Sequence, residues 1–164
     1  MKENPAIVLG QSEDIAKQKA MKDRLCEYRS LNKEIDNEIE RLERMEDRLY
    51  SLGSPTLGDM PKSKSSVYDK MADRVARKVD LEATIKELIS YRDSERVAIE
   101  GMVRRLRNAD ERAVIRMRYL DLEEWEDILY MLFGGKEDYD DKYDNYKQRM
   151  FRLHSAAIEG LAEL

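Results

Sequence analysis

Apolar residues recur at alternating spacings of three and four residues over two long stretches of the chain. In the first stretch, residues 12–52, polar residues occupy the seam only at Asn32 and Glu46. A seam this narrow predicts a coiled-coil helix, in which Asn32 would set the register. Ser12 precedes two acidic residues and is the expected N-cap of this helix. The apolar seam residues are Met21, Leu25, Tyr28, Ile35, Ile39, Leu42 and Leu49.

A segment rich in proline and glycine, residues 53–66, interrupts this pattern. Pro55 and Pro61 fit inside neither helix, because proline lacks an amide hydrogen-bond donor. The apolar spacing restarts at Val67 and continues to Leu106, so we expect a second long helix after the loop.

The two predicted helices are of similar length and are joined by one loop. Such a pair favours an antiparallel hairpin, here residues 12–107, preceded by a tail of residues 1–11. Because a two-helix core is thin, we expect additional burial against a second copy of the chain or against the C-terminal residues. Gly101, near the end of the second helix, indicates either a bend or a close contact between helices.

Three shorter helices are predicted after residue 107. Asn108, Asp121 and Asn145 each precede Glu or Gln at the spacing of a capping box, which marks the start of a helix. Gly134 and Gly135 are expected to end the second of these helices in the left-handed conformation. The three helices are expected over residues 109–120, 122–133 and 145–163.

The apolar residues of the three short helices are expected to close one small core. The chain is therefore predicted to be all-α, with a long antiparallel helical hairpin, or coiled coil, followed by a small three-helix helix-turn-helix head, residues 108–164. The expected core residues of the head are Val114, Met117, Leu120, Trp125, Ile128, Leu129, Leu132, Met150, Leu153, Ala157, Leu161 and Leu164.

The composition agrees with a helical chain. Charged residues make up 40% of it, against about 25% in ordinary globular proteins. Cys26 is the one cysteine, so the sequence offers neither an internal disulfide nor a cysteine metal cluster. It contains no signal-peptide core and no apolar run of about 18 residues. We therefore expect a cytoplasmic protein that is not attached to a membrane.

Basic and amide side chains gather near the start of the last predicted helix. Lys147, Gln148, Arg149 and Arg152 lie at the end that a helix-turn-helix inserts into a DNA groove, where such side chains contact phosphates and base edges. The head as a whole is acidic, since residues 108–164 contain 14 Asp and Glu against 8 Lys and Arg, a net charge of −6. Charge and spacing alone leave two alternatives, a DNA reader and a plain three-helix domain.

The head also carries a pattern of residues known from other proteins. The segments DERAVIRMRYLDLEEWEDILYML (residues 110–132) and RMFRLHSAAIEGL (residues 149–161) resemble the promoter-reading region 4 of bacterial sigma factors. With its coiled coil and the connector GDMPKSKSSVYDKMA (residues 58–72), the chain resembles a small family encoded by phages and prophages, mostly of unknown function. That family is similar in outline to the ArpU-type and RinA-type regulators of phage late genes. The resemblance implies transcriptional control through duplex DNA, with RNA polymerase as a second partner.

The resemblance also implies which residues contact DNA. Arg116 and Arg118 are weaker candidates for phosphate contact, and Arg118 fits better as a solvated arginine or one that flanks the core. Two features depart from the family pattern: the turn between the reading helices, residues 134–144, is long and acidic, and Leu129 stands where a small residue is usual. Either departure would let the fold persist without groove reading. The implied DNA-binding residues are Tyr146, Lys147, Gln148, Arg149 and Arg152.

Other candidate chemistry is weak. His154 is the only histidine and has no cysteine or histidine partner for a zinc site, so we expect it to pack the helix or to face phosphate. The acidic run 137–144 lacks the frame of a calcium loop. Tyr139, Tyr143 and Tyr146 would either stack on unpaired bases or pack this insert onto the head. Without a phosphate loop or a nucleophilic triad, we expect no enzymatic activity, metal or cofactor.

These observations predict a DNA-binding transcriptional regulator of phage or prophage type. The last helix of the head would contact duplex DNA, while the hairpin would mediate homodimerisation or partner docking. The alternative is an interaction module that keeps the helix-turn-helix shape without binding DNA, such as a phage packaging or assembly adaptor or an RNA polymerase-binding protein. A plain structural coiled coil is the third alternative.

Overall fold

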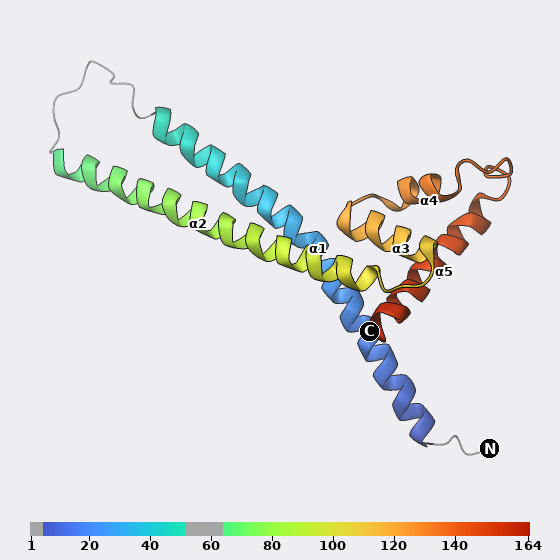
Figure 1. Ribbon diagram of the computed structural model, residues 1–164. Coiled ribbons are helices and arrows are strands. Elements are labelled where there is room, and N and C mark those ends of the chain that lie inside the picture. The colour runs from blue at the N-terminus through green and yellow to red at the C-terminus, as the bar shows by residue number, and fades with distance from the viewer. Residues whose placement is uncertain (1–4, 52–63) are drawn as a thin grey trace. The chain divides into compact units, whose positions relative to one another are not determined.

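Helices make up the regular structure of the described part of the chain (Figure 1). The computed structural model describes the backbone of residues 5–51 and 64–164 and, within these, the side chains of residues 13–50 and 70–164. The predicted all-α fold, with two long antiparallel helices followed by three shorter helices that pack together, is confirmed. The elements are α1 (Pro5–Ser51), α2 (Lys64–Val103), α3 (Ala109–Ile115), the π-helical turn η1 (Arg116–Leu120), α4 (Trp125–Phe133) and α5 (Tyr143–Ala162).

Helix α1 begins before its predicted start. Pro5 occupies its first turn, where the missing amide costs nothing and the fixed φ of proline suits a helix. The helix already contains Ser12, so the N-cap predicted there is wrong. Helix α2 begins at Lys64 and takes in the end of the predicted loop 53–66, whose other residues lie outside the described part of the chain.

Contacts divide the chain into two compact units. The first combines Met1–Ser30 with Ser94–Leu164, and the second is Leu31–Asp93. Each unit therefore contains parts of both long helices. The predicted boundary between hairpin and head, before residue 108, lies inside the first unit.

The second unit is a pair of helix segments with a thin core. Leu31 is buried next to a half-buried Asn32, so the predicted seam is shifted by one residue at this point. Lys78 joins the two helices, since its Nζ lies 2.9 Å from Glu46 Oε1 and 3.0 Å from Glu82 Oε1. The buried hydrophobic residues described in this unit are Leu31, Ile35, Leu81 and Ile85.

The main core of the first unit joins the long helices to the short ones. Leu25 of α1 and Ile99 of α2 belong to the same buried cluster as Ile115 of α3, Tyr119 of η1 and Ala157 of α5. Removing such side chains from water stabilises the fold by about 25 cal/mol per Å² of apolar surface. The expected burial of the hairpin against the C-terminal residues is confirmed.

A second buried cluster lies among the short helices, so the prediction of a single core for the head is wrong. Leu129 and Phe133 of α4 pack there with Met150 of α5. Two clusters form because the C-terminal part of α5 packs against the long helices while its N-terminal part packs against α4. Leu164 lies beyond the end of α5 and is 47% exposed, so its predicted burial is also wrong.

Asn108 caps α3 as predicted. Its Oδ1 accepts a hydrogen bond from the Asp110 amide at 2.9 Å, and its Nδ2 donates to Glu111 Oε1 at 3.3 Å. The first bond satisfies one of the backbone amides that the first turn of a helix leaves without partners, and the second joins the two side chains.

The helix starts predicted at Asp121 and Asn145 are wrong. Asp121 follows the last residue of η1, and α4 begins only at Trp125. Asn145 lies in the first turn of α5, which begins at Tyr143. Tyr143 packs against the second cluster, and this contact extends α5 beyond the point that the capping-box spacing marks.

Gly134 ends α4 without the predicted left-handed conformation. Its φ is −61°, and its amide donates to the Tyr130 carbonyl at 2.7 Å. A Cβ at this position would lie 2.5 Å from Cδ2 of the Tyr130 ring, so the missing side chain is what the site requires. The left-handed region is instead occupied by Leu122, at a φ of 65°, in the turn between η1 and α4.

Candidate nucleic-acid interface

Helix α5 has one exposed and one buried face. Asn145, Gln148, Arg149 and Arg152 are exposed, and their spacing of three and four residues places them on the same side of the helix. We refer to these four residues as the α5 row. The opposite face is buried through Met150, His154, Ala157, Ile158 and Leu161.

Three of the five predicted DNA-binding residues belong to the α5 row. Gln148, Arg149 and Arg152 are all exposed, and the Arg149 guanidinium lies 5.4 Å from the centre of the Phe133 ring. Within the described residues, neither arginine of the row is in an ion pair. Their charges are therefore available to an external anion, while the Gln148 amide can both donate and accept hydrogen bonds.

The other two predicted residues, Tyr146 and Lys147, lie outside the row. The Tyr146 hydroxyl donates to Asp138 Oδ1 at 2.7 Å, and this bond raises the pKa of Tyr146. The Tyr146 ring stacks on Phe133 with 5.0 Å between centres. Lys147 is half-buried, with Nζ 6.0 Å from the centre of the Tyr143 ring. Both side chains contact other residues of the head.

Asn145 is a member of the row that the sequence interpretation missed. Its match to a capping box identified it as a helix start, whereas it lies one turn before Gln148 and Arg149 within α5. The signal that reveals it is the series of residues 145, 148, 149 and 152, which is the spacing of one helix face.

The tyrosines of the insert between α4 and α5 pack it onto the head, as one of the two sequence alternatives predicts. Tyr139 stacks on Tyr146 with 6.2 Å between centres and meets Tyr143 and Tyr130 edge-on at 5.9 and 6.2 Å. Partners on several sides hold the ring of Tyr139 against the second cluster. The insert is thus part of the fold.

Only one acid of the insert is neutralised within the described structure. Asp138 accepts hydrogen bonds from Lys142 Nζ at 2.6 Å and from Tyr146, and these bonds lower its pKa. The other acids between α4 and the first turn of α5 are all exposed and form no ion pair among the described residues: Glu137, Asp140, Asp141 and Asp144. They place negative charge in the segment before α5 and in its first turn.

The two weaker candidates, Arg116 and Arg118, are both held by carboxylates. Arg118 Nη1 donates to Glu124 Oε2 at 3.0 Å, and its guanidinium lies 4.6 Å from the centre of the Trp125 ring. Its side chain is 14% exposed, as expected for an arginine that flanks the core. Arg116 forms a bidentate pair with Glu100, whose Oε1 is 2.7 Å from Nη2.

His154 is a packing residue. Its Nε2 lies 2.9 Å from the Tyr119 hydroxyl, and its ring meets Trp125 edge-on with 5.1 Å between centres. Burial, with smaller effects of the Lys22 and Arg118 charges, lowers the pKa of His154 to about 4. The imidazole is therefore neutral at pH 7, which leaves the expected helix-packing role and not the phosphate-facing one.

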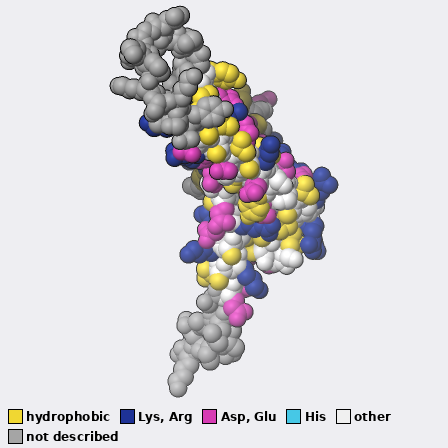
Figure 2. Space-filling view, turned by 90° about the vertical axis from the view of Figure 1, so that its left-hand side faces the viewer, with side chains coloured by type: hydrophobic (Ala, Val, Ile, Leu, Met, Phe, Trp, Pro, Cys, Tyr) yellow, Lys and Arg dark blue, Asp and Glu magenta, His cyan; other side chains and the backbone are white. Residues whose placement is uncertain are grey.

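Basic and acidic side chains are interspersed on the described part of the face seen in Figure 2. Among the described residues, no three His, Cys, Asp or Glu side chains are grouped so that they would hold a metal ion. No helix in residues 5–51 or 64–164 is long and apolar enough to cross a membrane.

No family model, curated protein or solved structure matches this chain.

Proposed function

We propose that the chain is a DNA-binding transcriptional regulator and that the α5 row is its contact with duplex DNA. The observation that carries this proposal is the row itself: two amides and two guanidiniums are exposed on one face, and neither arginine has a carboxylate partner in the described structure. Arginine contacts guanine and phosphate, and Asn or Gln contacts adenine, from a helix in the major groove.

The acids at the C-terminal end of α5 disfavour an approach of DNA to that end of the helix. Glu159 and Glu163 follow the row toward the C-terminal end of the helix, where a duplex would be repelled. The groove-reading helix of a helix-turn-helix contacts base edges with its N-terminal residues. The charges from the row to the end of α5 fit that orientation, but Asp144 and the insert acids Glu137, Asp140 and Asp141 at the N-terminal end oppose it.

The transcriptional part of the proposal rests on the resemblance of residues 110–132 and 149–161 to sigma factor region 4. On that basis RNA polymerase is a second proposed partner. A homodimer formed through α1 and α2 would present two heads to two half-sites, which raises the affinity without more contacts per head.

Fluorescence anisotropy with labelled duplex DNA, including prophage promoter regions, tests the proposal. Arg152→Ala and Arg149→Ala should each weaken binding roughly 5- to 150-fold if the side chain contacts a base, or reduce the salt slope by about one if it contacts a phosphate. Arg44→Ala, at an exposed arginine of α1, is the matched control and should change neither. If the chain changes the anisotropy of no duplex at low salt, it does not bind DNA and the proposal fails.

The second candidate is a protein-interaction module, and two observations favour it. The head has a net charge of −6, and α4 exposes the adjacent side chains Tyr130 and Met131 by 67% and 50%. Aromatic residues and Met are enriched in protein interfaces. Recovery of RNA polymerase or a packaging protein by the purified chain, together with no affinity for DNA, would select this candidate.

A further inference from the structure

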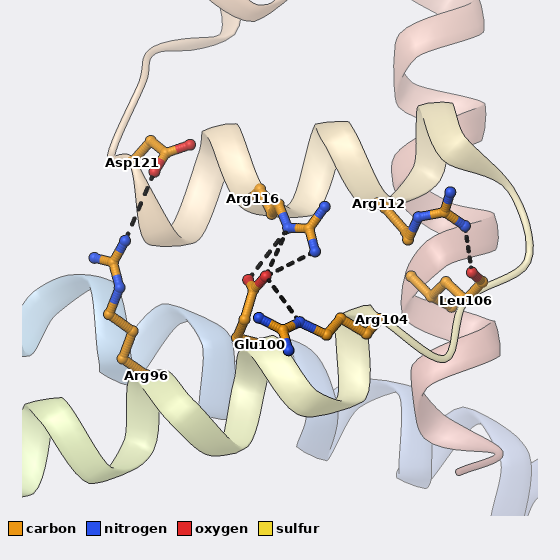
Figure 3. Close-up of polar contacts among 7 residues, drawn as sticks. All are labelled: Arg96, Glu100, Arg104, Leu106, Arg112, Arg116 and Asp121. Carbon is orange, nitrogen blue, oxygen red and sulfur yellow. Dashed lines mark hydrogen bonds and ion pairs between the residues drawn. The ribbon is translucent and has the colours of Figure 1, made fainter.

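An open groove of about 500 Å³ lies between the end of α2 and η1. Three arginines from two segments of the chain line it, and Figure 3 shows Arg104 and Arg116 beside Glu100 while Arg96 points to Asp121. Arg116 of η1 holds Glu100 in a bidentate pair, and Arg104 Nε lies 3.5 Å from Glu100 Oε1. The pair with Arg116 is the main cause that lowers the pKa of Glu100, so this carboxylate stays ionised. Glu100 thus holds the Arg116 guanidinium and lies next to that of Arg104, whose side chain is 72% exposed.

The third arginine, Arg96, is less firmly held. Its Nη2 is 4.0 Å from Asp121 Oδ1, and both side chains are half exposed. Its Nη1 donates to the Leu120 carbonyl at 3.3 Å, which keeps the guanidinium at the rim of the groove. The groove therefore carries three guanidiniums against two carboxylates, and Arg96 and Arg104 retain unused donors that face solvent.

The floor of the groove is apolar and open. Val97 lines the groove and is 73% exposed. A Cβ added to Gly101 would meet nothing within 4 Å, so the close helix contact suggested for this glycine is wrong. Gly101 instead leaves space beside Val97, and α2 continues past it to Val103.

We propose that this groove docks an acidic segment of a partner protein. An apolar side chain of the segment would cover Val97 and fill the space beside Gly101, and a neighbouring carboxylate would bind Arg96 and Arg104. Guanidiniums bind carboxylates through paired hydrogen bonds, and the excess of positive charge favours an acidic partner. The π-helical turn contributes Arg116 and Leu120, and such turns are frequent at functional sites.

A protein segment fits this groove better than nucleic acid does. A phosphate backbone has no apolar side chain to place on Val97 and would leave it uncovered. An apolar side chain gains from leaving water at the same place. The groove and the α5 row share no residue, so the proposal stands independently of DNA binding.

The test uses the full chain and a fluorescein-labelled peptide composed of Glu, Asp and Leu. Gly101→Leu should fill the groove without loss of stability, because the space is open and leucine is a better helix former than glycine. We expect Gly101→Leu and Arg104→Glu each to weaken peptide binding about tenfold or more. Arg105→Glu, which makes the same change of charge at the next, exposed residue outside the groove, should weaken it less than about twofold.

Thermal melts of all three variants establish that they fold. Full binding by Gly101→Leu would overturn the proposal, and so would equal losses in Arg104→Glu and Arg105→Glu, since the peptide would then respond only to net charge. Displacement of the peptide by duplex DNA from the wild-type chain, with weaker DNA binding by Gly101→Leu, would also overturn it and assign the groove to nucleic acid. Loss of DNA binding in variants of the α5 row has no bearing on these outcomes.

Discussion

The imidazole of His154 is buried in contact with Tyr119 and Trp125. Burial is the main reason that its pKa falls to about 4. In the unfolded chain a histidine has a pKa near 6.5. Between these two values the folded head keeps the imidazole neutral, while the unfolded chain binds a proton. The free energy of unfolding therefore depends on pH in this interval.

We predict that acidification from pH 7 to pH 5 destabilises the protein through His154. Its contribution is complete above the unfolded pKa of about 6.5 and is lost as the pH falls toward 4, because only the unfolded chain gains a proton there. The loss at pH 5 is about 2 kcal/mol. Urea unfolding at both pH values measures it. His154→Gln takes up no proton at this position and should lose less on the same change, and equal losses in the two proteins would contradict the prediction.

At the scale of residues, the spacing of residues along the helix predicted the exposure of side chains more accurately than it predicted their hydrogen-bond partners. Gln148, Arg149 and Arg152 are exposed on α5, as an amphipathic helix requires. Tyr146 is not available in the same way, because it bonds to Asp138 in the insert. The insert has no periodic pattern that would reveal such a contact. Its fold follows from the ring stacking of Tyr139, which depends on residues from both neighbouring helices.

At the scale of elements, the turn after α4 offers a prediction with an internal control. Gly134 and Gly135 are adjacent, yet only Gly134 lies against another group: a Cβ there would be 2.6 Å from the Tyr130 carbonyl oxygen. A Cβ on Gly135 would meet nothing within 4 Å. Gly134→Ala should lower the free energy of unfolding by about 1–3 kcal/mol, because the end of α4 must shift. Gly135→Ala should be neutral or slightly stabilising, since alanine restricts the unfolded chain.

Thermal or urea unfolding of the two alanine variants gives the comparison directly. The structure requires that Gly134→Ala be the less stable of the two. Equal stability would mean that the Tyr130 side chain and the end of α4 move aside without cost.

The extents of the elements were predictable where apolar periodicity defined them. The predicted first helix of the head, residues 109–120, coincides with α3 and η1 together. The capping-box spacing failed at Asp121 because the wide turn of η1 and the left-handed Leu122 delay the start of α4 to Trp125. Nothing in the sequence marks that turn, since leucine seldom adopts a positive φ.

At the scale of the whole molecule, the hairpin and the short helices follow from the sequence, but their division into units does not. Leu25 of α1 belongs to the cluster of Ile115 and Ala157, which are far from it along the chain. Arg29 of α1 reinforces this contact through Glu124, with 2.5 Å between Nη2 and Oε1. Such pairings depend on which faces meet after the helices form, and periodicity within one helix gives no information about them.

In the described part of the second unit several apolar side chains are exposed, which bears on the proposed homodimer. Met71, Val75 and Val79 of α2 recur every four residues and are each about half exposed. Two helix segments with so few buried side chains make a marginal core. A second copy of the chain would cover these residues and supply the missing burial, as the sequence analysis expects of the coiled coil.

We predict a dimer in sedimentation equilibrium of the full chain and its loss in Val75→Lys and Val79→Lys. A lysine ammonium buried at the interface without a partner costs several kcal/mol, so the dimer should dissociate while the helical content persists. Thr84→Lys is the matched control, because it adds the same charge at an exposed position on another side of α2. If dimerisation and two-head binding are linked, Val75→Lys should also weaken binding to paired DNA half-sites more than to a single half-site. A wild-type chain that stays monomeric at every concentration, or a dimer that tolerates both valine substitutions, would exclude this surface as the dimer interface.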